Sequence, residues 1–369
     1  MSQDLESELR AALRPIAPSA SFEKKLIASV TNDPQHSQPK PDRRGGAGWH
    51  SRTRWLSLAA AACLLIGLGL DFYPAATAAP QSGAQSFPHP AIWRVHHGQN
   101  TLYLFGSLHI LPNTLSWKSP EVDAAMRASE VFMFEVPVDA QTLAAEKDFI
   151  LRNGILPRGA SLRAALSPDE YRIYSTILKG AGLNPQLFDR YRPWLASVMV
   201  GLAYLHRQDF TNLKGADDVL IAYARSQKKQ LRYFESMEQQ LGLLTRIDDT
   251  VQIKALKDLI ESLPQAREHE AQLVESWARG DANRLAGLID NYFVGHPDAK
   301  KLLVDDRNRA WLPRIKDLID SGSTALVTVG AAHIGGDTGL LQDLCAEGYE
   351  VERLGDEGAP SAKVCGPGA

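Results

Sequence analysis

Short apolar runs along the chain predict the strands of a sheet, and longer stretches with a helical period separate them. Mostly apolar runs at residues 102–105, 131–134 and 325–329 are each followed at once by a glycine or a carboxylate, as expected for buried strands. Between about residues 139 and 320 apolar side chains recur with a helical period, which predicts a large, mostly helical insertion. The pattern therefore predicts an α/β (α+β) fold whose mixed central β-sheet carries this insertion.

Other elements follow from local signals. A β-hairpin is expected from strands at 92–95 and 101–105, with His96 and His97 in a five-residue loop between them. Ser119 followed by Pro120 is typical of a helix start, and residues 231–234 and 350–354 are expected to form two further strands. Amphipathic helices are expected at residues 141–153, 167–179, 194–208, 216–226, 250–263, 266–279 and 305–319.

The segment before the predicted sheet contains an apolar run that predicts a single transmembrane helix. Residues 55–70 carry no charge, and arginines crowd the segment before them. Extended to Tyr73, the helix would be roughly 28 Å long, close to the bilayer core of about 30 Å. The positive-inside rule places the N-terminus in the cytoplasm. This predicts a cytoplasmic segment and linker at 1–54, a signal-anchor at 55–73, a linker at 74–90 and the main domain at 91–369.

A second interpretation is a cleaved signal peptide with the cleavage site at residues 76–78. The leader before the apolar run would then exceed fifty residues, and it contains an amphipathic stretch at 1–30 that looks retained. We therefore favour the anchor over cleavage, and over a buried helix of a soluble domain. The resulting prediction is a single-pass inner (cytoplasmic) membrane protein whose main domain is periplasmic.

Charge and cysteine content limit the partners. The net charge of -3 and the isoelectric point of about 6.4 give no electrostatic footprint for nucleic acid. The expected partners are the membrane through residues 55–73, a peptide or small-molecule substrate, and a cytoplasmic protein for residues 1–30. Cys345 and Cys365 are the two cysteines beyond the apolar run, so an oxidising compartment would permit one disulfide. Two unpaired thiols are the alternative.

Two histidines follow strand-like runs with the same spacing. His109 lies three residues after Gly106, and His333 lies three residues after Gly330. Each GxxH histidine would lie at the C-terminal end of its strand, where open α/β sheets bind ligands. If the strands are neighbours, the imidazoles converge on one site. The alternative is two strand-end histidines with structural roles.

A carboxylate joins this pair. Glu135 ends the run at 131–134, so a strand beside the GxxH strands would place it at the same edge. Two imidazoles and a carboxylate suit a divalent transition metal and leave positions for water. Such a metal lowers the pKa of bound water, which permits hydrolysis near neutral pH. A solvated strand end is the alternative role for Glu135.

Two further segments could support the site. Glu235 follows the strand-like run at 231–234 and repeats the layout of Glu135. Arg307 and Asn308 begin the last long helix, where an arginine could hold an anionic group or pair with an acid. The glycine-rich loop after His333 opens another helix, whose N-terminus could bind an oxyanion.

These motifs, taken in order, resemble the TraB/GumN family, which includes the Tiki metalloproteases. The matching segments run from about residue 92 to 354, and leave out residues 1–90. They are residues 103–109, Trp117, Pro120, residues 134–135, residues 215–217, residues 234–235 with a following glutamine, residues 307–311 and residues 329–340. The resemblance implies an α/β core with a helical insertion and, in the Tiki branch, metal-dependent hydrolysis with Mn or Co.

Carried onto this sequence, the resemblance assigns roles to six residues. His109, Glu135 and His333 become metal ligands, for Mn, Co or Zn, or catalytic bases, and Glu235, Arg307 and Asn308 become the supporting catalytic residues. The predicted function is a membrane-anchored, periplasm-facing metal-dependent hydrolase, a peptidase in the first instance. The alternatives are a metal-free hydrolase and a non-catalytic module that binds a peptide or a haem-like ligand.

Overall fold

The computed structural model describes residues 88–111, 115–206, 215–355 and 362–366. The predicted anchor at 55–73, the segment at 1–54 and most of the linker at 74–90 lie outside these residues. Within the described residues, no helix has both the length and the apolar character needed to cross a bilayer.

Seven strands form one mixed sheet in the order β4-β3-β5-β2-β1-β6-β7. Strands β4, β3, β5 and β2 are parallel neighbours, whereas β1 is antiparallel to β2 and β6, and β7 is antiparallel to β6. The C-terminal ends of the four parallel strands therefore meet at one edge of the sheet. The strands are β1 (Ile92–His97), β2 (Asn100–Ser107), β3 (Val131–Phe134), β4 (Gln230–Tyr233), β5 (Ala325–Gly330), β6 (Glu350–Arg353) and β7 (Ala362–Cys365).

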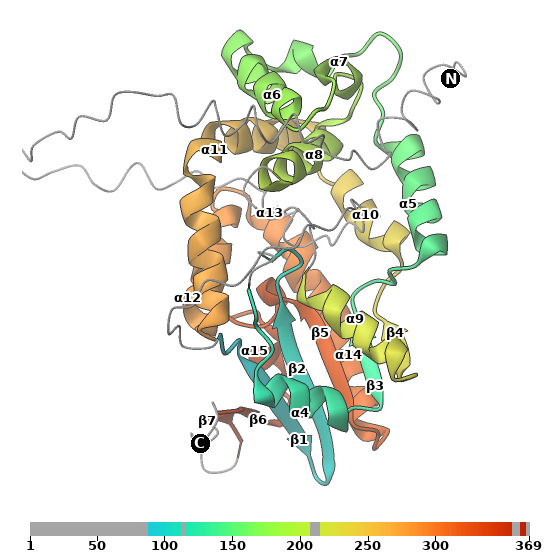
Figure 1. The fold of residues 1–369 in the computed structure, drawn as a ribbon, viewed down its shortest axis with the longest axis vertical. Coiled ribbons are helices and arrows are strands. Elements are labelled where there is room, and N and C mark those ends of the chain that lie inside the picture. Colours follow the sequence, from blue (N-terminus) through green and yellow to red (C-terminus); the bar gives the residue numbers. More distant parts are fainter. Residues whose placement is uncertain (1–87, 112–114, 207–214, 356–361, 367–369) are drawn as a thin grey trace, which may run out of the picture.

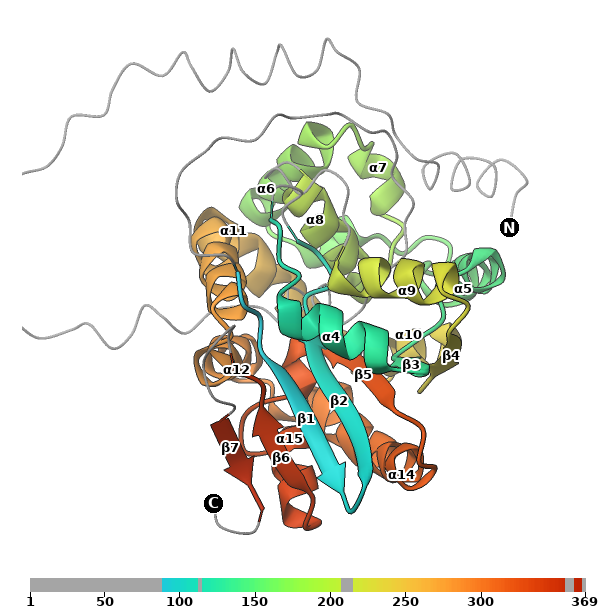
Figure 2. The same cartoon turned by 60° about the horizontal axis from the view of Figure 1, so that its bottom comes forward.

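The alternation of side chains along the strands builds a core on each face of the sheet. In β3, Phe132 belongs to one buried cluster and Met133 to the other, because successive side chains of a strand point to opposite faces. Helices α4 (Pro120–Ala128) and α9 (Ala216–Ser226) cover one face, as Figure 2 shows. Helices α14 (Asp306–Asp320) and α15 (Leu340–Ala346) cover the other. The sheet is thus the middle of three layers.

The remaining helices form a block beyond the C-terminal ends of the parallel strands (Figure 1). Serine caps begin two of them, since Ser167 and Ser236 each form a capping box with the residue three positions later. The block contains α5 (Ala140–Asn153), α6 (Pro168–Gly180), α7 (Pro185–Phe188), α8 (Pro193–His206), α10 (Met237–Thr245), α11 (Asp249–Ala278), α12 (Ala282–Asp290), α13 (Pro297–Lys300), the π-helix η3 (Lys301–Asp305) and the short 3-10 turns η1 (Leu162–Ala165), η2 (Asn291–Phe293) and η4 (Ala331–His333).

Two details of the sequence prediction were wrong. The hairpin loop has two residues rather than five, because Gly98 adopts a φ of 61° and lets pairing continue to His97 and Asn100. His96 and His97 therefore belong to β1. The two helices expected at 250–263 and 266–279 are one 30-residue helix, α11. Its packing against α8 and α12 stabilises this long helix.

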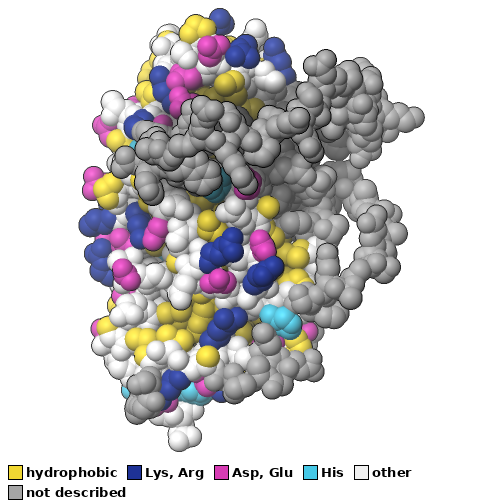
Figure 3. All heavy atoms as spheres, turned by 90° about the vertical axis from the view of Figure 1, so that its left-hand side faces the viewer, with side chains coloured by type: hydrophobic (Ala, Val, Ile, Leu, Met, Phe, Trp, Pro, Cys, Tyr) yellow, Lys and Arg dark blue, Asp and Glu magenta, His cyan; other side chains and the backbone are white. Residues whose placement is uncertain are grey.

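Charges of both signs are mixed over one side of the molecule. On the face in Figure 3, Lys and Arg side chains lie among Asp and Glu side chains, with apolar areas between them. Neither sign forms a broad field on this face, as expected from the small net charge of the chain.

Candidate functional site

Four of the six predicted site residues lie just beyond the ends of the parallel strands. His109 follows β2, Glu135 follows β3, Glu235 follows β4, and His333 ends the 3-10 turn η4 directly after β5. Because β3 lies between β4 and β5, and β5 lies beside β2, all four side chains reach the same sheet edge. The other two, Arg307 and Asn308, are buried in the first turn of α14.

Glu135 is the centre of this cluster and is only 4% exposed. Its Oε1 accepts a hydrogen bond from the Gly330 N–H at 2.7 Å. Its Oε2 accepts one from Gln240 Nε2 at 3.0 Å and one from Arg307 Nη2 at 2.5 Å. Burial is the largest influence and raises the pKa of Glu135, but the Arg307 charge and the other neighbours lower it to about 2. Glu135 is therefore a carboxylate at neutral pH.

Both GxxH histidines face the same oxygen of Glu135. His109 Nε2 and His333 Nε2 each lie 3.9 Å from Glu135 Oε1, so the two nitrogens are no further apart than twice that distance. A Cβ built on Gly330 would lie 3.2 Å from His109 Nε2 and 3.3 Å from Glu135 Oε1. The second-motif glycine therefore leaves space between the predicted ligands that a side chain would fill.

His109 is oriented by Asp217, near the start of α9. His109 Nδ1 lies 2.8 Å from Asp217 Oδ2, and an ionised carboxylate only accepts, so Nδ1 carries a proton. Ser107 Oγ donates to the other Asp217 oxygen at 3.0 Å. Gly215 permits this arrangement, because a Cβ there would lie 2.4 Å from the His109 carbonyl.

The other nitrogen of His109 has no hydrogen-bond partner among the described residues, although it is buried. Burial is the largest influence and lowers the pKa of His109, but the charge and hydrogen bond of Asp217, helped by Glu135, raise it to about 9. His109 is thus an imidazolium at neutral pH, and a metal ion would have to displace the proton from Nε2.

His333 is oriented by Asn308. The Asn308 Nδ2 donates to the carbonyl oxygens of His333 and Thr338 at 3.3 and 2.9 Å, which fixes the amide with Oδ1 toward the ring. His333 Nδ1 lies 2.7 Å from that oxygen and must donate to it. Burial, aided by the Arg307 charge, lowers the pKa of His333 to about 3, so the ring is neutral. Its Nε2 lone pair faces Arg307 Nη1 at 3.2 Å.

Arg307 links the two carboxylates of the cluster. Its Nε and Nη2 bind Glu235 at 3.0 Å each, while Nη2 also binds Glu135. The guanidinium lies 4.5 Å over the Trp311 ring, and Trp311 Nε1 donates to Glu235 Oε1 at 3.0 Å. Burial lowers the pKa of Arg307, but the charges of Glu135 and Glu235 raise it by more. The guanidinium therefore stays charged. The π-helix η3 precedes this turn of α14.

The residue types of this cluster suit a divalent transition metal, but the side chains are not yet spaced as metal ligands. Both histidines hold Nδ1 protons against acceptors and turn Nε2 toward Glu135, the arrangement of metal-binding histidines with outer-shell partners. Yet no group of three or more His, Cys, Asp or Glu side chains among the described residues is arranged to hold a metal. Arg307 Nη1 occupies the lone pair of His333, so a metal would take its place on that nitrogen.

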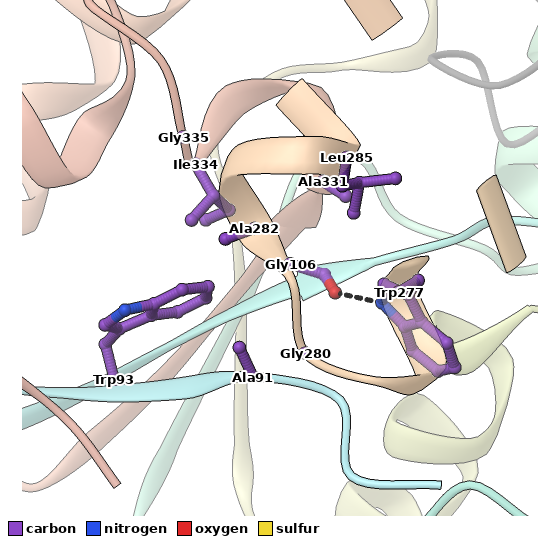
Figure 4. Close-up of a pocket in the computed structure, with 10 residues that line it drawn as sticks. All are labelled: Ala91, Trp93, Gly106, Trp277, Gly280, Ala282, Leu285, Ala331, Ile334 and Gly335. Atoms are coloured by element: carbon purple, nitrogen blue, oxygen red, sulfur yellow. Dashed lines mark hydrogen bonds between the residues drawn. The ribbon is translucent and has the colours of Figure 1, made fainter. Parts of the chain in front are cut away.

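The first-motif glycine has a separate packing role. There is no room for a side chain at Gly106, because a Cβ there would lie 2.9 Å from Ile334 Cγ1. Its carbonyl accepts a 2.7 Å hydrogen bond from Trp277 Nε1 at the end of α11, as Figure 4 shows. Gly106 and Ala331 line a small apolar pocket with Trp93. The two motifs therefore pack against each other where Gly106 meets Ala331 and Ile334. Their histidines lie in the polar cluster.

Sequence reasoning assigned no role to Asp217, Gln240 or Trp311. The available signal is that residues 215–217, residues 234–235 with a following glutamine, and residues 307–311 belong to the segments that resemble the family. An acid in the first turn of a helix usually complements the helix dipole, so Asp217 alone did not indicate a histidine partner.

Comparison with known proteins places this chain in a family. Residues 91–353 match the TraB/PrgY/gumN family. The chain is 25% identical to Metalloprotease TIKI1 of Danio rerio over 75% of this chain and 64% of that protein, so it spans less than two thirds of that relative. It is 22% identical to the uncharacterized protein YbaP of Escherichia coli (strain K12), over 69% of this chain and 92% of that protein. The chain belongs to the TraB/PrgY/gumN family.

Proposed function

We propose that this protein is a metal-dependent hydrolase of peptide bonds, with a divalent ion of Mn, Co or Zn held by His109, Glu135 and His333. The observation that carries the proposal is the paired orientation of the histidines. Each has Nδ1 held by an acceptor from a helix, Asp217 or Asn308, and each turns Nε2 toward Glu135 Oε1. The likeness to a protein named Metalloprotease TIKI1 supports the same reaction class.

The bound ion would supply a water of lowered pKa and a Lewis acid for a carbonyl oxygen. The protein's own residues divide the other tasks. Asp217 and Asn308 hold the histidines in the tautomers that expose Nε2. Arg307, buried and charged, can bind negative charge that develops beside Glu135. Glu235 accepts hydrogen bonds from Arg307 and Trp311 on Oε1 and from Arg307 on Oε2, so we assign it to positioning Arg307 rather than to proton transfer.

A metal-free hydrolase is the second candidate, and the Arg307 contact favours it. Arg307 Nη1 already occupies the His333 lone pair, which leaves His109 Nε2 as the nitrogen without a partner among the described residues. In that mechanism the charged His109, held by Asp217, would act first as a general acid and donate its Nε2 proton to the leaving amine, and the attacking water would then return a proton to Nε2. Glu135 would keep His109 charged through its own negative charge.

The proposed location is the outer face of the cytoplasmic membrane. The apolar run at 55–73 would be the anchor, and residues 1–30 would remain in the cytoplasm for a protein partner. Cys345 and Cys365 form a disulfide in the structure. Such a bond is typical of proteins in oxidising compartments such as the periplasm, which supports this orientation.

Metal content and turnover test the function together. We would load the full-length, detergent-purified chain with Mn, Co or Zn, remove free metal, and measure bound metal and cleavage of a quenched fluorogenic peptide library. The variants His109→Ala and His333→Ala should each lose near-stoichiometric metal and turnover. The control is His97→Ala, whose side chain is 58% exposed on the hairpin.

The outcomes separate the two candidates. Metal and turnover lost in both site variants, and kept in the control, support the metal-dependent reaction. Turnover without metal, abolished by His109→Ala, moves the assignment to the metal-free mechanism. Metal retained in both site variants contradicts the proposed ligands.

A further inference from the structure

A small hollow opens beside the candidate ligands, between β3 and the helices α9 and α10. It encloses about 310 Å³ including its open mouth. Two kinds of side chain line it: the polar groups are His109, Glu135, Asp217 and Gln240, and the apolar ones are Phe134, Val136, Val138 and Ile221. The hollow thus joins the polar cluster to an apolar wall.

Two buried polar atoms on this lining lack a hydrogen-bond partner within the described part of the chain. They are His109 Nε2 and Gln240 Oε1. Leaving such an atom unpaired costs about 1–3 kcal/mol, so each needs a partner that the described side chains do not supply. The proposed metal accounts for His109 Nε2. Nothing in the proposed function accounts for Gln240 Oε1.

The orientation of the Gln240 amide follows from its other contact. Gln240 Nε2 lies 3.0 Å from Glu135 Oε2. The reverse assignment would place the amide oxygen against a carboxylate oxygen, two acceptors facing each other. Gln240 therefore donates to Glu135 and keeps its oxygen as an acceptor. The residue is 1% exposed, so solvent does not satisfy that oxygen.

We propose that Gln240 Oε1 accepts the backbone N–H of a bound peptide, and that the adjoining apolar wall takes a small aliphatic side chain of the same residue. This inference rests on the proposed function and names its substrate class. A peptide group provides the donor that the unpaired oxygen needs, and an aliphatic side chain of the same residue would lie against Val136 and Ile221, which line the same hollow. The glutamine thereby fixes the substrate relative to Glu135.

Matched ligands can isolate this one hydrogen bond. The probes are N-acetyl-valine hydroxamate, which binds divalent metals, and its analogue methylated on the acetamide nitrogen, which lacks the backbone N–H but keeps the metal-binding hydroxamate. Their Kd values would be measured by calorimetry on the full-length chain loaded with Mn. Methylation should weaken binding to the wild-type protein roughly tenfold, the value of one satisfied buried hydrogen bond. In Gln240→Met, which has similar length and no amide, the two ligands should bind equally.

The ratio of the two Kd values separates this role from a structural one. Losing the bond to Glu135 weakens both ligands in Gln240→Met alike, so their ratio changes only if the oxygen contacts the N–H. The control is Gln239→Met, an exposed neighbour that bonds to the Ser236 backbone instead, and it should keep the tenfold ratio. Replacing valine by glycine in the probe should also cost roughly tenfold, because the apolar contact is lost.

Each failure has a distinct meaning. A ratio near one in the wild-type protein, or a tenfold ratio that persists in Gln240→Met, overturns the role of Gln240 and leaves the proposed metal site standing. If neither hydroxamate shows metal-dependent binding to the wild-type protein, the proposed function and this inference are both wrong.

Discussion

At the scale of single residues, the two histidines differ in charge although they share a motif. Burial lowers the pKa of both rings, but the Asp217 carboxylate raises the pKa of His109 to about 9, whereas His333, held by a neutral amide beside Arg307, keeps a pKa of about 3. The partner of Nδ1 thus decides whether the ring carries a proton on Nε2. Metal binding must overcome a proton at one histidine and a guanidinium at the other.

The Asp217 contact gives the first prediction. In Asp217→Asn the partner of His109 is no longer an anion, so the orientation and basicity of the ring both suffer. We expect metal affinity to fall about 10- to 100-fold, and the free energy of unfolding at neutral pH to fall as well, because the buried His109 loses its ionic partner. Competition with a metal-chelating dye measures the affinity. The control is Asp218→Asn, whose side chain bonds the Gly215 N–H instead. Equal losses in both variants would contradict the role of Asp217.

A buried acid outside the site gives the second prediction. Glu146 in α5 is 2% exposed, and neither carboxylate oxygen has a partner among the described residues. Burial raises its pKa from 4.5 to about 7. The folded state therefore binds more protons than the unfolded state between these values. The free energy of unfolding should fall as pH rises from about 4.5 to about 7, by about 3 kcal/mol in full.

Urea unfolding at pH 5 and pH 8 checks this. Glu146→Gln should remove about 3 kcal/mol of the pH dependence, because an amide does not titrate. The exposed Glu268→Gln should leave the wild-type pH dependence unchanged. If Glu146→Gln keeps that dependence, another group causes it.

At the scale of elements, the candidate site residues at strand ends could be predicted from the sequence, whereas those on helices could not all be. His109, Glu135, Glu235 and His333 could be predicted because apolar runs mark strands and parallel strands end at one edge. The strand order itself, with β3 between β4 and β5, depends on long-range pairing that local patterns do not encode. Gln240 lies on α10, where a buried polar side chain has the same helical spacing as a core residue.

The junction of β5 and η4 gives the third prediction. Gly330 has φ of -53° and ψ of 140°, which alanine adopts without strain. In Gly330→Ala the new methyl group would fill the space between His109 Nε2 and Glu135 Oε1. We expect metal affinity to fall at least tenfold, while the free energy of unfolding falls by only about 1–3 kcal/mol. The measurements are metal titration and urea unfolding.

A glycine elsewhere serves as the matched control. Gly242 lies inside α10, and a Cβ there would have no heavy atom within 4 Å. Gly242→Ala should raise the free energy of unfolding by about 0.5–1 kcal/mol and leave metal affinity unchanged. If Gly330→Ala also leaves metal affinity unchanged, the space beside Gly330 is not part of the metal site.

At the scale of the whole molecule, the sheet separates the polar cluster from the disulfide-linked C-terminal strands. The polar cluster lies at the C-terminal ends of β4, β3, β5 and β2, and the helical block lies beyond these strand ends (Figure 1). The other edge of the sheet is formed by β6 and β7. There the Cys345–Cys365 disulfide joins β7, the last described strand, to α15. Sequence spacing permitted this bond without deciding it, because pairing of two distant cysteines depends on how β7 adds to the sheet.

The disulfide gives the last prediction, and its size shows how far the C-terminal strand shares in global folding. The two cysteines are 20 residues apart, and a loop of that length contributes about 3 kcal/mol when both ends belong to the cooperative unit. The Cys345→Ser, Cys365→Ser double variant should therefore lose about 3 kcal/mol in urea unfolding and keep its metal affinity. Reductant should destabilise the wild-type protein equally and leave the variant unchanged. A loss near zero would mean that β7 separates from the sheet before the core unfolds, so the disulfide would constrain only an edge strand.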